Sequence, residues 1–341
     1  MLTERQVLVL KAIVEEFVQT ALPVGSRSLS KKTELNFSAA TIRNDMADLE
    51  ELGFLEKTHT SSGRVPSQQG YRFYVDHLVA KEALAASEET VFFDQLLTQK
   101  QLEREVAVKE AMTLLSSLTN YTSIALGPSW QNCRVQKIQF VPISYAQAVL
   151  ILITDHGHVE NRTINLPQGI SGKAMEAIIK ALDELLVGTL VSEVQERLDA
   201  GFESNLHDFV SYKEEIVYAM LQLLSQSMQS SNVVLSGRSN ILKQPDFSDL
   251  SQVSPLLEMM EQNDFVKVIE TTESNQHQLT VRIGQENEIK AMENCTLITV
   301  PYQIGASEYG KIALLGPTRM EYQKIIPLLE HVARMMSDLY K

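Results

Sequence analysis

The sequence has little cysteine. Its 341 residues include only Cys133 and Cys295, which lie far apart along the chain. Each falls in a mostly apolar segment typical of a strand, where a thiol is expected to be buried. This usage favours reduced thiols in a cytosolic compartment over a disulfide.

Long apolar runs are also missing. The longest stretches, such as residues 148–153, fall far short of the ~20 residues that cross a bilayer, so no membrane span is predicted. Met1 leads directly into a polar, helix-forming stretch, without the basic start, apolar core and cleavage site of a secretory leader. We therefore expect a cytoplasmic protein that has no membrane partner.

Recognisable catalytic motifs are absent as well. Gly305, Gly310 and Lys311 fit most of a phosphate-binding loop, but residue 312 is isoleucine where that loop needs a hydroxyl for magnesium. The segment 155–158 (Asp-His-Gly-His) has no partner cluster, so a solvated turn is favoured over a metal site. The sequence predicts no catalytic residue, no cofactor and no metal, and hence no enzyme.

The charge is unevenly distributed. The net charge of −13 divides into −1 for residues 1–77 and −12 for the other 264 residues. Two or three domains are expected at this length, so the amino-terminal part can act separately from the acidic remainder. If the protein binds a nucleic acid, residues 1–77 are the expected site, because the acidic remainder disfavours non-specific binding to phosphates.

Three helices are predicted in the first ~50 residues. Thr3 begins a capping box for a helix that ends near Thr20. The segment 22–25 (Leu-Pro-Val-Gly) cannot continue that helix, and Ser26 is expected to cap a second helix that extends to about Glu34.

The third helix is expected to begin after Ser38 and to end at Gly53 in the left-handed conformation. Its predicted inward positions are Ile42, Met46, Leu49 and Leu52.

The outward face of this third helix carries side chains that can read DNA. In a helix-turn-helix, the second helix of the pair projects its first turns into the major groove. Arginine can pair with guanine, asparagine with adenine, and hydroxyls and free amides at the helix start suit phosphate. The candidate contacts are Ser38, Thr41, Arg43 and Asn44. An ordinary cap and a solvated helix face fit the same pattern.

A β-ribbon is predicted next. Residues 54–58 form an expected strand, 59–63 a polar turn and 64–66 the return strand. Together with the helices they make a winged helix, whose wing reaches a flanking DNA backbone or minor groove, although an ordinary hairpin is the alternative. Gly63 is expected to let the ribbon approach closely. The candidate contacts on the wing are Lys57, Ser61, Ser62 and Arg64.

Several segments carry specific motifs. They are Ala40-Thr-Ile-Arg-Asn-Asp-Met46, Leu49-Glu-Glu-Leu-Gly-Phe-Leu55, His59-Thr-Ser-Ser-Gly-Arg-Val-Pro66, Gly70-Tyr-Arg-Phe-Tyr-Val-Asp76 and Gly310-Lys-Ile-Ala-Leu-Leu-Gly-Pro-Thr-Arg-Met320. With these motifs the chain resembles the HrcA-type heat-inducible transcription repressors of bacteria at both ends, while residues 167–247 match no motif.

The resemblance implies a homodimeric repressor of chaperone operons that binds an inverted-repeat operator in double-stranded DNA and is kept competent by the GroE chaperonin. It places Thr41, Arg43 and Asn44 on the recognition helix, and Ser61, Ser62 and Arg64 on the wing. It also implies a GAF-like domain that carries an inserted dimerisation domain.

The rest of the chain predicts an α+β fold. A long amphipathic helix is expected over residues 87–119. Strands are expected at 135–142, 147–154, 159–166, 280–283, 296–302 and 311–315, and helices at 172–186, 213–228 and after Pro317. The run 135–166 is expected to pair with strands more than 100 residues later.

The predicted domains follow from this order. They are the winged helix at 1–77, a linker helix and the first half of the GAF-like domain at 78–166, the mostly helical inserted dimerisation domain at 167–247, and the second half of the GAF-like domain at 248–341. A second functional hypothesis is a small-molecule-responsive transcription regulator whose GAF-like body is the ligand sensor. A ligand that raises thermal stability would distinguish it.

Overall fold

The computed structural model describes most of the chain. The described residues are 2–33, 35–57, 63–79, 93, 104–127, 133–144, 147–155, 159–165, 172–203, 218, 233–247, 250–262, 264–271, 278–304 and 308–340. No helix within these ranges has the length and apolar character that a bilayer crossing requires.

The described elements mix helices with antiparallel sheets, as the sequence predicted. The helices are α1 (Glu4–Thr20), α2 (Ser26–Leu29), α3 (Ala39–Glu51), α4 (Gln68–His77), α6 (Arg104–Thr119), α7 (Gly172–Leu186), α8 (Val194–Glu203), α10 (Leu250–Glu261), α11 (Asp264–Thr271) and α12 (Tyr322–Leu339). The strands are β1 (Leu55–Lys57), β2 (Arg64–Pro66), β3 (Thr122–Leu126), β4 (Val135–Pro142), β5 (Gln147–Thr154), β6 (Val159–Asn165), β7 (Val233–Ser236), β8 (Thr280–Ile283), β9 (Cys295–Ile304) and β10 (Glu308–Pro317). Short 3-10 helices occur at 191–193, 238–243, 245–247, 284–286 and 290–292.

The chain divides into two compact units. One combines residues 1–126 with 234–341, and the other is residues 127–233. Within the first unit we call residues 1–77 the head, and residues 104–126 and 234–340 the body.

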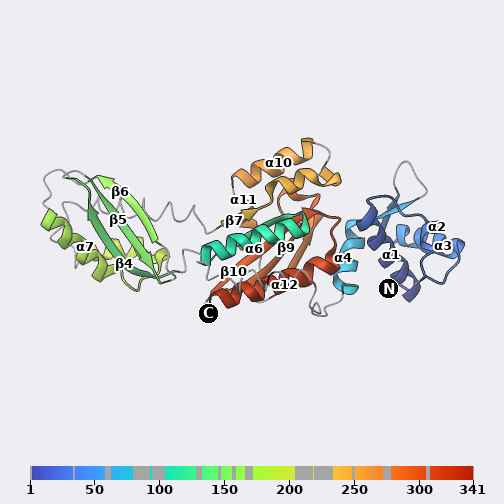
Figure 1. The fold of residues 1–341 in the computed structure, drawn as a ribbon, viewed down its shortest axis with the longest axis horizontal. Helices are drawn as coiled ribbons and strands as arrows, with labels where there is room; N and C mark the ends of the chain where they lie inside the picture. The colour runs from blue at the N-terminus through green and yellow to red at the C-terminus, as the bar shows by residue number, and fades with distance from the viewer. Residues whose placement is uncertain are drawn as a thin grey trace. The chain divides into compact units, whose positions relative to one another are not determined.

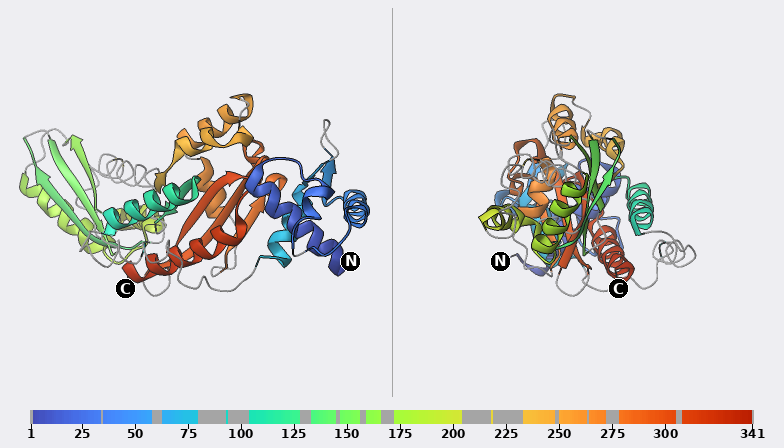
Figure 2. Two further views of the ribbon diagram at one scale, coloured as in Figure 1. Left: turned by 45° about the vertical axis from the view of Figure 1, so that its right-hand side comes forward. Right: turned by 90° about the vertical axis from the view of Figure 1, so that its left-hand side faces the viewer.

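The body is built on a five-stranded sheet in the order β7-β3-β10-β9-β8. Strand β10 pairs antiparallel with both β3 and β9, with Ala313 opposite Ile124 on one side and Thr299 on the other. Helices α6 and α12 lie side by side against this sheet (Figures 1 and 2). Since β3 is buried along its whole length, the body's core surrounds this central pair of strands.

The second unit has its own three-stranded antiparallel sheet, in the order β4-β5-β6. Alternate residues of β5 are buried, as expected for a sheet that is covered on one face. The buried side chains Leu150 and Leu152 belong to a separate apolar core with Ile178 and Leu182 of α7.

This arrangement corrects two predictions. Strands β4–β6 pair with one another, whereas the sequence predicted that 135–166 would pair with later strands. The second unit is residues 127–233, whereas the predicted insertion was 167–247. The reason is that β4–β6 bury their apolar face against α7, while the stretch 234–247 is tied to the body, where the Asn240 side chain donates to the Ser116 and Tyr121 carbonyls at 3.2 and 3.3 Å.

Other elements lie close to their predicted positions. Strand β8 and helix α7 have the predicted bounds, and α12 contains Pro327 in its second turn. The predicted helix 87–119 is described only from Arg104, and the predicted helix 213–228 lies outside the described residues apart from Tyr218. Cys133 and Cys295 are buried and form no disulfide, as predicted.

Candidate DNA-binding site

The head begins with two capped helices that pack on each other. The Thr3 hydroxyl accepts from the Gln6 amide at 3.3 Å, the predicted capping box, and α1 ends at Thr20 with Ala21 in the left-handed conformation. Ser38 caps α3 by accepting from the Thr41 amide at 3.1 Å. Ile42, Met46 and Leu49 are buried as predicted, with Leu10 and Ile13 of α1 in the same core.

Helix α2 is shorter than predicted. It covers Ser26–Leu29, and Gly25 is its N-cap, so Ser26 is the first helical residue and not the cap. The Ser26 side chain is buried, and the chain after Leu29 continues in turns such as the bond from the Lys32 amide to the Leu29 carbonyl. Glu34, the predicted end, lies outside the described residues.

The end of α3 corrects the prediction for Leu52. Gly53 is left-handed, with φ +82°, and the Phe54 amide donates to the Leu49 carbonyl at 2.9 Å, which is a Schellman motif. Leu52 is therefore the C-cap and is 52% exposed, whereas it was predicted to face inward. Phe54 packs inward in its place, edge-on against Phe73.

The outward face of α3 presents the predicted base-reading side chains. Arg43 and Asn44 are exposed, and neither has a hydrogen bond or ion pair among the described residues. The Ser38 and Thr41 hydroxyls lie 2.9 Å apart at the start of the helix, so both also serve the cap. The four predicted α3 residues are thus brought to the first turns of one helix.

The β-ribbon forms as β1 and β2, with Lys57 directly opposite Arg64. Val24 adds a third short pairing, because its amide and carbonyl both bond with Arg64 at 2.9 Å. Lys57 is exposed. Ser61 and Ser62, the predicted wing hydroxyls, lie outside the described residues.

Arg64 and Gly63 hold the ribbon against the helices. The Arg64 guanidinium donates to Glu50 of α3 at 2.6 Å and is only 16% exposed. A Cβ on Gly63 would lie 2.8 Å from that of Pro23, so this position needs glycine for packing within the head. The sequence pattern had suggested a DNA contact for Arg64 and had not revealed this link to α3.

Asp45 is a further residue that the sequence analysis missed. Its carboxylate is buried on α3 and accepts two hydrogen bonds from the Arg5 guanidinium of α1, at 2.7 and 3.0 Å. Asp45 raises the pKa of Arg5 through this bond. Next to this pair, Gln6 donates to Asp48 at 3.2 Å. These bonds fix the rotation of α3 on α1, and an acidic residue one position after Asn44 gave no sequence signal for them.

The electrostatics of this face favour an anionic ligand. Asp45, Asp48 and Glu50 of α3 each accept hydrogen bonds from the head itself. The exposed cations of the head are Arg5, which is bonded to Asp45, and Arg27, Lys31, Arg43 and Lys57. The surface around α3 therefore has cations available for phosphate, while three of its acids are already bonded.

The described part of the chain contains no group of three or more side chains suited to a metal ion. Lys311 of the phosphate-loop-like segment lies in β10 and donates to the Ile269 carbonyl at 2.6 Å. No helix start follows it, which agrees with rejecting that motif.

Comparison with known proteins identifies the relatives of this chain. The sequence model described as "HrcA protein C terminal domain" matches residues 105–326. A curated relative from Bacillus pumilus (strain SAFR-032), "Heat-inducible transcription repressor HrcA", is 42% identical over 99% of this chain and 98% of its own length. A relative of the same name from Halalkalibacterium halodurans is 40% identical over 100% and 99%.

A solved structure described only as "a hypothetical protein" shares the fold, with a TM-score of 0.67 and 26% identity over 100% of this chain and 99% of that one. The curated relatives are transcription repressors, which is a non-enzymatic role. Identity at this level over the full length settles the family, and this chain belongs to the HrcA heat-inducible transcription repressors.

Proposed function

We propose that this repressor binds an inverted-repeat operator as a homodimer, with α3 of each head in the major groove. The observation that carries the proposal is the pairing of exposed Arg43 and Asn44 on a capped helix whose buried acid, Asp45, is already bonded to α1. In this reading α1–α3 are the helix-turn-helix and β1–β2 the wing. The remaining candidate contacts are Ser38, Thr41, Lys57, Ser61, Ser62 and Arg64.

The body and the second unit have distinct roles in this proposal. The five-stranded sheet with α6 and α12 is the GAF-like domain, and residues 127–233 are the inserted dimerisation domain. The outward face of its sheet supports this role, because Val141, Val149, Ile151, Ile153 and Val159 share it and all are partly or fully exposed. The same face carries the exposed polar side chains Lys137, Gln139, Asn161 and Thr163. A mixed aliphatic and polar face suits a second copy of the same chain, and a two-fold dimer requires a two-fold operator.

The repressor is proposed to act in the cytoplasm on chaperone operons, with the GroE chaperonin keeping it competent. The strand pairing supports a need for a chaperonin, because β3 must pair with β10, which follows the second unit in the sequence. Such non-local pairing folds slowly and exposes apolar segments meanwhile.

Base readout by Arg43 provides the test. Arg43→Ala is expected to weaken operator binding by ~1–3 kcal/mol and to relax the base preference at one position of each half-site. Lys57→Ala is the matched control, because a phosphate contact should weaken binding to all sequences alike. Arg64→Ala should also weaken binding to all DNA sequences, since the ribbon loses its bond to Glu50.

Affinity and base preference would be measured together, by selection from a randomised half-site library. Arg43→Ala protein that keeps both the affinity and the preference of the wild type would contradict the assignment of α3 as the recognition helix.

A further inference from the structure

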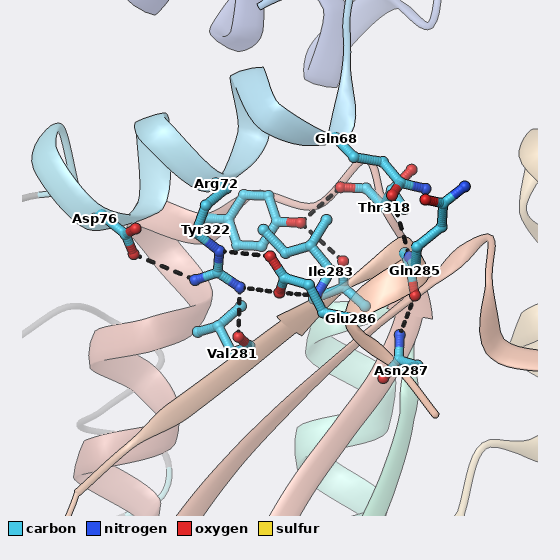
Figure 3. A network of polar contacts seen from close by, with 12 residues as sticks. Gln68, Arg72, Asp76, Val281, Ile283, Gln285, Glu286, Asn287, Thr318 and Tyr322 are labelled. Carbon is cyan, nitrogen blue, oxygen red and sulfur yellow. Dashed lines mark hydrogen bonds and ion pairs between the residues drawn. The ribbon is translucent and has the colours of Figure 1, made fainter. Parts of the chain in front are cut away.

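Helix α4 of the head is docked on the body by an arginine with several partners. The Arg72 guanidinium donates to the Val281 carbonyl at 2.6 Å, to Glu286 from Nε at 2.8 Å and to Glu286 again from Nη2 (Figure 3). It also donates to Asp76 of its own helix at 3.2 Å. Because the bonded Glu286 also accepts from the Ile283 amide at 2.8 Å, Arg72 is tied to the backbone at the end of β8.

The start of α4 makes a second attachment. The Gln68 side chain accepts from the Gln285 amide at 3.1 Å and donates to the Glu293 carbonyl at 3.3 Å. Gly284 lies directly beneath it, because a Cβ there would come within 2.1 Å of the Gln68 side chain. The start and the middle of α4 are therefore bonded to the same edge of the body.

A third attachment comes from the opposite direction. Arg319, between β10 and α12, donates to the Val18 carbonyl in the last turn of α1 at 2.7 Å. Its other nitrogens donate to Asp246 at 2.8 and 3.3 Å, and its side chain is only 11% exposed. Tyr71 packs on Tyr322 between these attachments, with ring centroids 6.1 Å apart.

These attachments restrict the motion of the head. They involve α1 and α4 of the head and three separate segments of the body, so the head cannot turn without breaking bonds to partly buried arginines. A polar cleft of about 450 Å³ lies beside them, lined by Glu56, Gln69 and Thr318 among others. Buried apolar residues of the head and the body also belong to one core, so these bonds add specific attachments to a continuous apolar interface.

From this geometry we propose that Arg72, Gln68 and Arg319 are positioning residues that fix the head on the body and thereby set the operator's half-site spacing. The inference rests on the proposed dimeric binding to an inverted repeat. One added base pair moves a half-site by about 3.4 Å and rotates it by about 34°. A head held at three points cannot follow that displacement by turning on its own body, whereas a loosely joined head can.

The experiment compares spacings on one operator. The probe is the duplex that footprinting of the wild-type protein defines, remade with one, two and five base pairs inserted between its half-sites. The proteins are full-length wild type, Arg72→Ala, Gln68→Ala and, as a matched control, Arg334→Ala at an exposed arginine of α12. Thermal unfolding verifies that each variant is folded.

The wild type and Arg334→Ala are expected to bind the altered spacings at least ~10-fold more weakly than the original operator. In Arg72→Ala and Gln68→Ala this ratio should fall to within ~3-fold, with unchanged affinity for an isolated half-site and weaker binding to the original operator.

Two results would overturn the inference. If Arg72→Ala and Gln68→Ala both keep the spacing selectivity of the wild type, other contacts set the spacing. Tighter binding of the variants to the original operator would show that the attachments between head and body inhibit DNA binding. If the wild-type protein protects no DNA in footprinting, the proposed function itself is wrong. Failure of the inference and failure of the proposed function are therefore distinguishable.

Discussion

At the scale of single residues, charged side chains in the head divide into those that hold the fold and those left for a ligand. Arg64 was a predicted DNA contact, yet its guanidinium is bonded to Glu50 of α3. Asp45, which gave no signal in the sequence, is bonded to Arg5 of α1. Arg43 and Asn44 have no such partner among the described residues. The partners of a charged residue, more than its type, therefore identify the contacts worth testing.

A buried phenol makes stability depend on pH. Tyr121 is 8% exposed, and burial raises its pKa to about 12. The folded state favours the neutral phenol, so its contribution is complete below the unfolded pKa of about 10 and is lost as the pH rises toward 12. Across that range the wild type should lose about 2–3 kcal/mol more unfolding free energy than Tyr121→Phe.

Urea unfolding at pH 9 to 12 measures this difference. Tyr218→Phe, at a side chain that is 64% exposed, controls for the loss of one phenol. Parallel losses in wild type and Tyr121→Phe would show that the Tyr121 phenol does not couple to folding.

At the scale of elements, the ends of helices could be predicted from the sequence, but the contacts between distant elements could not. Ser38 and Gly53 fix the ends of α3 through bonds to their near neighbours, and the sequence alone located both. Leu52 was misplaced because the left-handed turn at Gly53 redirects the chain and brings Phe54 inward. The bond between Arg5 and Asp45 joins residues 40 positions apart, which a helical period cannot reveal.

Strand pairing failed for the same reason. Strands β4–β6 were located within a residue or two, but alternation of apolar residues says nothing about which strand lies alongside. Their partners are one another because α7, which follows them, covers the buried face. The Arg72 and Arg319 attachments also depend on tertiary structure, with partners more than 200 residues away.

The exposed sheet face of the second unit yields a prediction about assembly. Ile151→Glu places a charge in the centre of the outward face of β4–β6, between Gln139 and Asn161, and we expect it to weaken self-association by roughly 2 kcal/mol or more. Operator affinity should fall with it, because each head would then bind a single half-site. Sedimentation velocity over a range of concentrations measures the effect.

Gln195→Glu, at an exposed residue of α8, is the control for one added negative charge. A dimer that survives Ile151→Glu at wild-type strength would exclude this face as the interface.

At the scale of the whole molecule, the strands of the body's sheet come from both sides of the second unit in the sequence. We therefore expect chaperonin to raise the fraction of molecules that bind operator, while the affinity of each competent dimer stays nearly unchanged. An allosteric effector would change that affinity instead. Stoichiometric titration of labelled operator, with and without chaperonin and nucleotide, separates these cases. An unchanged active fraction would contradict the role of the chaperonin, but it would not contradict the assignment of the protein as a repressor.

The pairing of β3 with β10 also has a consequence in time. Strand β3 ends at Leu126 and β10 begins at Glu308, so the ribosome must make the whole intervening stretch before the two can meet. At about 5–20 residues per second, that interval is on the order of 10–40 s. During it the side of β3 that faces β10 has no partner strand, although Ile124 is fully buried in the finished body. Each newly made repressor thus begins with an apolar strand whose partner on one side has not yet been made.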